Sequence, residues 1–197
     1  MAKTRTIEEQ EELNKQLSYA ATKGDIPAIK KALKDGAEVD SRNPNLYTPL
    51  DEAAFNGKTD AIIALLEAGA EVDPRGGNHQ FTPLHWAAFE GHGAAAEVLL
   101  AAGADPTLLN VDGKTSVDVA HGNGNKALAN YLQSIVDAPE KRPTPEGVGL
   151  DMNRRNEALK TMGKPIPKPV VGAHTAKVLT GMEAQRLAAL NDPGEGI

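Results

Sequence analysis

The ten residues from Thr82 to Gly91 read TPLHWAAFEG, and related stretches recur along the chain at a nearly constant interval. TPLDEAAFNG begins at Thr48 and TSVDVAHGNG at Thr115, which gives steps of 34 and 33 residues. A weaker copy, KQLSYAATKG, begins at Lys15, another 33 residues back. A fixed interval of roughly 20–50 residues is typical of a protein built from stacked repeats.

Each unit also contains the signals that start and stop two helices. Thr82 is a favourable N-cap, Pro83 suits the first helical position, and Gly91 can end the helix in the left-handed conformation. An apolar run follows in each unit and ends at a Gly-Ala pair, which begins at Gly36, Gly69 and Gly103. A pair of short helices cannot bury its own apolar faces, so the sequence predicts that neighbouring units stack on each other.

The sequence resembles the ankyrin repeat family. The resemblance rests on marks that recur together in one unit: Thr82-Pro83-Leu84-His85, Ala87-Ala88, Gly91-His92, Leu99-Leu100 and Gly103-Ala104-Asp105. It covers about residues 13–137 and implies an all-α ankyrin-repeat solenoid with hairpin-like fingers. We expect two central repeats and two capping repeats, because the first and last copies depart from the Thr-Pro-Leu-His pattern. Residues 1–12 would form an N-terminal segment, and residues 138–197 a C-terminal extended arm.

Composition excludes several function classes. There is no cysteine, so the chain has neither a disulfide framework nor a thiolate site. No secretory signal or membrane span is recognisable, which predicts a cytoplasmic protein with no membrane contact. Residues 1–137 hold 12 Lys and Arg against 20 Asp and Glu, whereas residues 138–197 hold nine against seven. An acidic body argues against nucleic-acid binding.

The segment from Ala138 onward differs in composition. It holds seven of the 13 prolines and seven of the 19 glycines, as expected of an extended linker. Two stretches could form short helices, with apolar side chains to attach the tail: Leu159 and Met162 in the first, and Met182, Leu187 and Leu190 in the second. The tail is either dispensable or an arm that becomes ordered on a partner.

The histidines are the first candidates for chemistry. His85 and His92 lie seven residues apart, but a helical metal site needs histidines four residues apart, and Gly91 interrupts the helix between them. The resemblance gives both a structural role. No nucleophile motif or phosphate-binding loop appears. The sequence therefore predicts no metal, cofactor or small-molecule substrate, and a histidine-dependent hydrolytic or metal enzyme is a remote alternative.

The aromatic residues are the better functional candidates. Six of the seven fall at or beside the Thr-Pro-Leu and Ala-Ala marks. In the ankyrin family such positions face a concave binding surface, which implies these partner-binding residues: Tyr47, Phe55, Asn56, Phe81, Trp86, Phe89 and Glu90. The alternative is that the rings only fill gaps between helices.

The sequence thus predicts a non-enzymatic protein–protein interaction module. Its partner would be another protein, such as a larger enzyme or a multi-subunit complex on which the chain is an accessory, regulatory or scaffolding subunit. In this hypothesis the concave aromatic face and the C-terminal arm both bind the partner. An alternative is a self-inhibited adaptor whose basic tail folds back over the acidic concave face.

Overall fold

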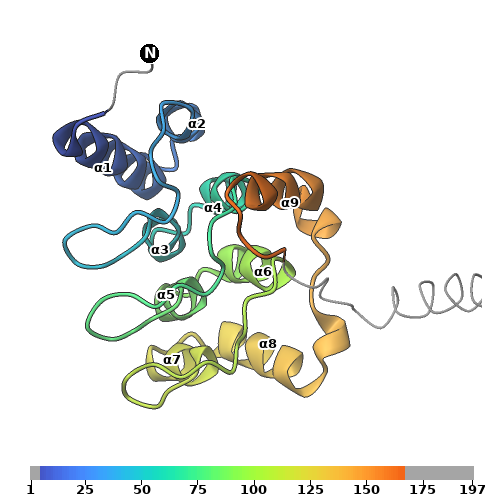
Figure 1. Cartoon of the computed structure of the whole chain (residues 1–197). Helices are drawn as coiled ribbons and strands as arrows, with labels where there is room; N and C mark the ends of the chain where they lie inside the picture. The colour runs from blue at the N-terminus through green and yellow to red at the C-terminus, as the bar shows by residue number, and fades with distance from the viewer. Residues whose placement is uncertain (1–4, 167–197) are drawn as a thin grey trace, which may run out of the picture.

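The computed structural model describes residues 5–166, and four antiparallel helix pairs form its main body (Figure 1). The first helices of the pairs are α1 (Ile7–Lys23), α3 (Pro49–Phe55), α5 (Pro83–Glu90) and α7 (Ser116–Gly122). The second helices are α2 (Ile26–Lys34), α4 (Thr59–Glu67), α6 (Gly93–Ala101) and α8 (Lys126–Asp137). No strand occurs among the described residues, so this part of the fold is all-α as expected.

Capping boxes start the first helices where the repeated threonines predict. Thr48, Thr82 and Thr115 are N-caps, and each bonds reciprocally with the third helical residue. That residue is Asp51, His85 or Asp118. In the first unit Thr6 and Glu9 form the capping box, so α1 begins at Ile7, within the predicted N-terminal segment. The first helix of this unit is therefore longer than the other three.

The core consists of the leucine and alanine positions of the repeat. Four of these side chains are fully buried: Leu50, Leu84, Ala53 and Ala87. Because alanine is small, the first helices can pack closely side by side. Burial of apolar surface between units supplies the main stabilisation of such a stack.

The loops between helix pairs form three fingers, residues 35–48, 68–82 and 102–115, which project from the first-helix side (Figure 1). Gly76 and Gly77 fit the second finger closely against the first. A Cβ atom on Gly76 would lie 2.3 Å from the Leu46 carbonyl oxygen, and one on Gly77 would lie 2.3 Å from Tyr47 Cε1. A side chain at Gly76 would push the two fingers apart, and one at Gly77 would displace the Tyr47 ring.

Polar side chains connect successive units across the fingers. The Asp40 carboxylate accepts from the Glu71 N–H at 3.0 Å, and that of Asp73 accepts from the Asp105 N–H at 3.0 Å. These bonds repeat at the period of the sequence, so they hold the fingers in register.

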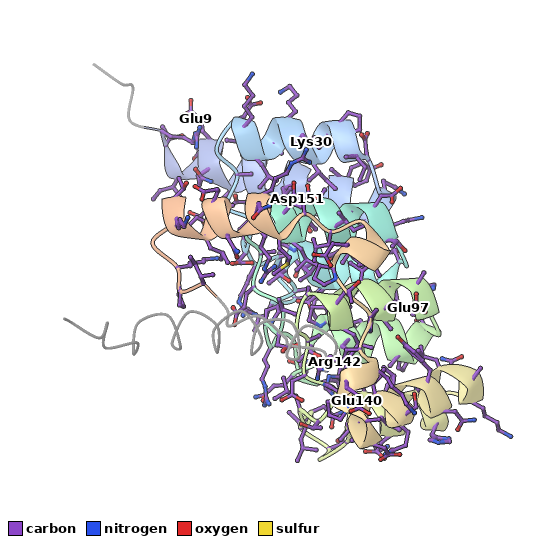
Figure 2. The ribbon with its side chains drawn as sticks, turned by 90° about the vertical axis from the view of Figure 1, so that its right-hand side faces the viewer. Glu9, Lys30, Glu97, Glu140, Arg142 and Asp151 are labelled. Atoms are coloured by element: carbon purple, nitrogen blue, oxygen red, sulfur yellow. The ribbon has the colours of Figure 1, made fainter. Side chains whose placement is uncertain are left out.

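Residues 138–166 form a C-terminal strap along the second helices. The strap contains η1 (Pro139–Lys141), η2 (Glu146–Val148) and α9 (Met152–Thr161), which contact α8, α6 and α4 respectively. Figure 2 shows α9 lying across α4, with Asp151 just before it and Arg142 near α8. The predicted helix around Leu159 is thus present, but it packs on the chain itself, and Leu159 is buried.

Cations of the strap bond to carbonyl groups at the C-terminal ends of second helices. Arg142 donates to the Ala104 carbonyl at 3.0 Å, and the buried Arg155 donates to the Leu66 carbonyl at 3.3 Å. Lys164 bonds to Asp40 and to the Gly69 carbonyl. Carbonyl ends of helices attract positive charge. The weakly basic character of residues 138–166 is therefore partly explained by contacts within the chain.

This position of the strap corrects the expectation of an extended arm for residues 138–166, which lie along the second helices. The self-inhibited adaptor requires a tail that folds over the first helices, and it stays a prediction for the residues beyond Ile166. The expected helix with Met182, Leu187 and Leu190 lies outside the described residues.

His85 joins the third unit to the third finger. Its Nδ1 accepts from the Thr82 N–H at 3.3 Å and the Thr82 hydroxyl at 2.8 Å. Because Nδ1 is an acceptor, Nε2 carries the proton and donates to the Lys114 carbonyl at 3.2 Å. Burial lowers the pKa of His85, which keeps this neutral form at neutral pH.

Replacement of His85 by alanine should destabilise the stack, because the Thr82 N–H and the Lys114 carbonyl would both lose a bond. We expect a loss of roughly 1–3 kcal/mol in the free energy of unfolding, measured by urea denaturation and circular dichroism. His121→Ala is the control, since His121 is exposed at the end of α7. A His85→Ala protein as stable as the control would contradict the structural role.

Replacement of Asp51 by asparagine should change how stability depends on pH. Burial raises the pKa of Asp51 to about 7 from 3.8. The folded state therefore binds a proton that the unfolded state releases, and the free energy of unfolding falls as pH rises from about 4 to 7. Asp51→Asn removes this loss, so its stability relative to the native chain should increase over that window.

Asp118→Asn is the matched control for this experiment. Asp118 occupies the same capping position but is exposed, and hydrogen bonds from Thr115 lower its pKa. Its stabilisation is present above its ordinary pKa of 3.8 and is lost only at lower pH. Parallel pH profiles for both variants between pH 4 and 7 would contradict the role of buried Asp51.

Candidate protein-binding surface

Five aromatic rings from neighbouring units form one cluster, and Trp86 lies at its centre. Trp86 contacts the other four rings at centroid distances of 4.7–6.1 Å, all with edge-to-face geometry. The members of this aromatic cluster are Tyr47, Phe55, Phe81, Trp86 and Phe89. Edge-to-face contacts are favourable, so the cluster fixes the orientation of its rings.

The cluster has an exposed part and a supporting part. Phe55 is 41% exposed and Phe89 is 37% exposed, and both are at the C-terminal ends of first helices. Trp86 and Tyr47 are partly buried. Phe55 and Phe89 are therefore the rings with the largest exposed fraction among the predicted residues.

Phe81 departs from the expectation that it faces a partner. It is only 7% exposed, because the second finger closes through a hydrogen bond from the Gly76 N–H to the Phe81 carbonyl and the ring stacks on His85 at 5.3 Å. Phe81 therefore packs against Trp86 and Phe89 inside the cluster, and it is not part of the exposed surface that a partner could contact.

The two polar candidates lie beside the exposed rings. Asn56 caps α3, and its side chain donates to the Glu52 carbonyl at 2.8 Å. Glu90 is exposed at the end of α5. The Glu52 carboxylate accepts from Asn43 at 2.6 Å and from Thr22 at 3.0 Å, which fixes its position on the same surface.

Two grooves lie between the first helices and the fingers. One, of about 420 Å³, is formed by the third and fourth units and is lined in part by Tyr47, Trp86, Phe89, Asp112, Lys114 and Asp118. The other, of about 660 Å³, lies at the first two units and is lined in part by Tyr19, Lys15 and Arg42. We call the surface formed by the first helices and the fingers the concave face.

Sequence reasoning missed the contribution of the outer units to this surface. Asp112, Lys114 and Asp118 belong to the last unit, which the sequence identified only as a cap. Tyr19, 66% exposed, occupies in the first unit the position that Trp86 holds in the third. Its alignment with Trp86 was the available signal for the first groove.

The two predicted tail residues within the described range, Leu159 and Met162, differ in their exposure. Leu159 is buried within the strap, so it is unavailable to a partner in this structure. Met162 is 45% exposed, and its sulfur would lie 3.3 Å from a Cβ atom on Gly69. The exposed part of Met162 is on the second-helix side, away from the aromatic cluster.

The two histidines of the predicted pair each lie within hydrogen-bond distance of a backbone carbonyl in a different segment of the chain. His85 is bonded to Thr82 and Lys114 as described, and His92 Nε2 is 3.1 Å from the Phe55 carbonyl. Across residues 5–166, no group of three His, Asp or Glu side chains could hold a metal ion. In that same range no helix has both the length and the apolar character needed to cross a membrane.

A family model for ankyrin repeats, described as three copies, matches residues 17–110. This range begins within the second half of α1 and continues through α6 to the third finger. A search of curated proteins finds no match. Ankyrin repeats bind other proteins and are generally not enzymes. The family match and the stacked helix pairs together show that residues 17–110 are ankyrin repeats and that the chain folds as an ankyrin-repeat solenoid.

Proposed function

We propose that the chain is a non-catalytic accessory, regulatory or scaffolding subunit that binds one protein partner on its concave face. The observation that carries this proposal is the pair of exposed rings at matching positions of neighbouring units, Phe55 and Phe89, with Trp86 between them. A larger enzyme or multi-subunit complex is the partner that suits a module with no chemistry of its own.

The energetics of the rings support this assignment. Large apolar side chains on a surface are costly to leave in water, and clusters of them are typical of interface hot spots. Phe55 and Phe89 are held against Trp86 at 5.4 and 6.1 Å, so little side-chain freedom is left to lose on binding. Burial of each exposed ring can contribute on the order of 1–3 kcal/mol.

The alternative that the rings only fill gaps applies to part of the cluster. Phe81 is buried and Trp86 is partly buried, so both contribute to packing between units. Phe55 and Phe89 leave more than a third of their surface in solvent. Filling a gap does not require that exposure.

We also propose that the C-terminal arm binds the partner, but the arm begins after the strap instead of at Ala138. Residues 138–166 are committed to the strap, so a second attachment to the partner would come from residues beyond Ile166 or from the exposed part of Met162. Two linked attachments would raise affinity through effective concentration.

Replacement of both Phe55 and Phe89 by alanine should abolish capture of the partner while leaving the helical circular dichroism unchanged. Loss of two anchor rings should weaken binding at least about tenfold, since each tenfold step corresponds to about 1.4 kcal/mol. Proteins captured from native extract by the native chain would be identified by mass spectrometry. Their affinity for the purified variant would then be measured.

The matched control is Ile7→Ala with Ile166→Ala. It removes two exposed apolar side chains that lie outside the aromatic cluster. Equal partner affinity of the Phe55→Ala/Phe89→Ala protein and the native chain would sink the concave-face proposal.

A chain that ends at Ile166 tests the arm without disturbing the strap. We expect reduced partner affinity and unchanged helical content. Removal from Ala138 onward is a poorer test, because it would also uncover α4, to which α9 contributes Leu159 and Arg155. Unchanged affinity of the chain ending at Ile166 would confine binding to residues 1–166.

A further inference from the structure

We propose that the groove between the third and fourth units receives an arginine or lysine side chain from the bound partner. This inference rests on the proposed function and specifies the chemistry of the partner segment at that site. It rests on three observations. Aromatic side chains line the groove, two carboxylates lie at its edge, and one of these carboxylates forms no ion pair within residues 5–166.

The wall of the groove is aromatic. Trp86, Tyr47, Phe81 and Phe89 all line it, and Val119 of α7 adds an aliphatic side chain. The faces of aromatic rings attract cations, most strongly in the case of tryptophan. The methylene stem of an arginine or lysine side chain also packs well on such rings.

The rim of the groove carries two carboxylates from the last unit. Asp112 is exposed in the third finger, and its carboxylate forms no ion pair with any residue from 5 to 166. Asp118 is exposed at the start of α7, where the Thr115 N–H and hydroxyl bond to one of its oxygens at 2.9 and 2.7 Å. These bonds lower the pKa of Asp118, so it is ionised at neutral pH.

Other partner groups fit the groove less well. An acidic side chain would meet two carboxylates of the same sign. A purely apolar side chain would cover the rings but would also remove water from Asp112 without replacing its hydrogen bonds, which is unfavourable. An arginine satisfies both halves of the groove, because its planar guanidinium can stack on a ring and bond to a carboxylate.

Lys114 carries a positive charge in the same groove as Asp112 and Asp118, so its removal tests whether the groove prefers a positively charged side chain. It lines the same groove, its side chain is exposed, and it lies close enough to Asp118 to contribute to the lowered pKa of that carboxyl. An incoming cation would be repelled by Lys114. Removal of this charge should therefore strengthen binding, whereas removal of the Asp112 charge should weaken it.

The experiment uses Trp86 fluorescence as its readout, because this is the only tryptophan in the chain and it lines the groove. The full-length protein is titrated with tryptophan-free synthetic peptide pools. The central residue of each pool is fixed as arginine, lysine, citrulline, leucine or glutamate, and the flanking residues are randomised. Citrulline has nearly the shape of arginine without its charge.

We expect the arginine pool to bind most tightly, followed by the lysine pool. The citrulline, leucine and glutamate pools should bind at least about tenfold more weakly, and added salt should weaken arginine binding. Asp112→Asn should reduce arginine binding severalfold and Lys114→Gln should increase it. Glu97→Gln, a charge removal on α6 of the second-helix side (Figure 2), should change nothing.

The outcomes separate this inference from the proposed function. If the leucine pool binds as tightly as the arginine pool, or if no pool alters Trp86 fluorescence, the cation site is overturned. The proposed function is still supported in either case, provided that Phe55→Ala with Phe89→Ala abolishes partner capture. If that double variant captures the partner normally, the proposed function fails, and the cation site fails with it as a partner-binding site.

Discussion

Each helix pair in this fold has more apolar surface than it can cover by itself, and this constraint governs the rest of the structure. Two helices of seven to nine residues, as in the second and third units, bury Leu and Ala against each other and still leave a face on each side. The neighbouring unit must cover that face. The closeness of the units then brings the fingers together, aligns Asp40 and Asp73 with the backbone of the next unit, and places rings from two units around Trp86.

In the proposed function, the side chains that bind the partner are ones that the packing of the helix pairs does not require. The buried Leu and Ala positions are sufficient for the core, whereas Phe55 and Phe89 add surface at the ends of first helices. The carboxylates of the last unit complete a groove that no single unit contains. The concave face is therefore a property of the assembled stack, and its chemistry differs from one groove to the other.

The helix pairs could be predicted from the sequence because their signals are local and repeated. Thr82, Pro83 and Gly91 act on the backbone within a few residues, and the same signals recur near residues 48 and 115. The exposure of each ring could not be predicted in this way. Phe81 aligns with Tyr47, and both were expected on the concave face, but Phe81 is buried where the second finger closes at Gly76, whereas Tyr47 is only partly buried. The strap was missed because its prolines and glycines carry no periodicity, and its cations bond to backbone carbonyls of distant helices.

The strap also changes how the molecule should behave as a folding unit. In a simple solenoid each unit contacts only its neighbours, so the ends can fray while the middle persists. Here Arg155 reaches Leu66, 89 residues earlier, and Lys164 reaches Asp40, 124 residues earlier. These contacts, distant in sequence, join the end of the described chain to the region of its second unit. Such contacts couple distant units into one cooperative transition, and they should form late in folding.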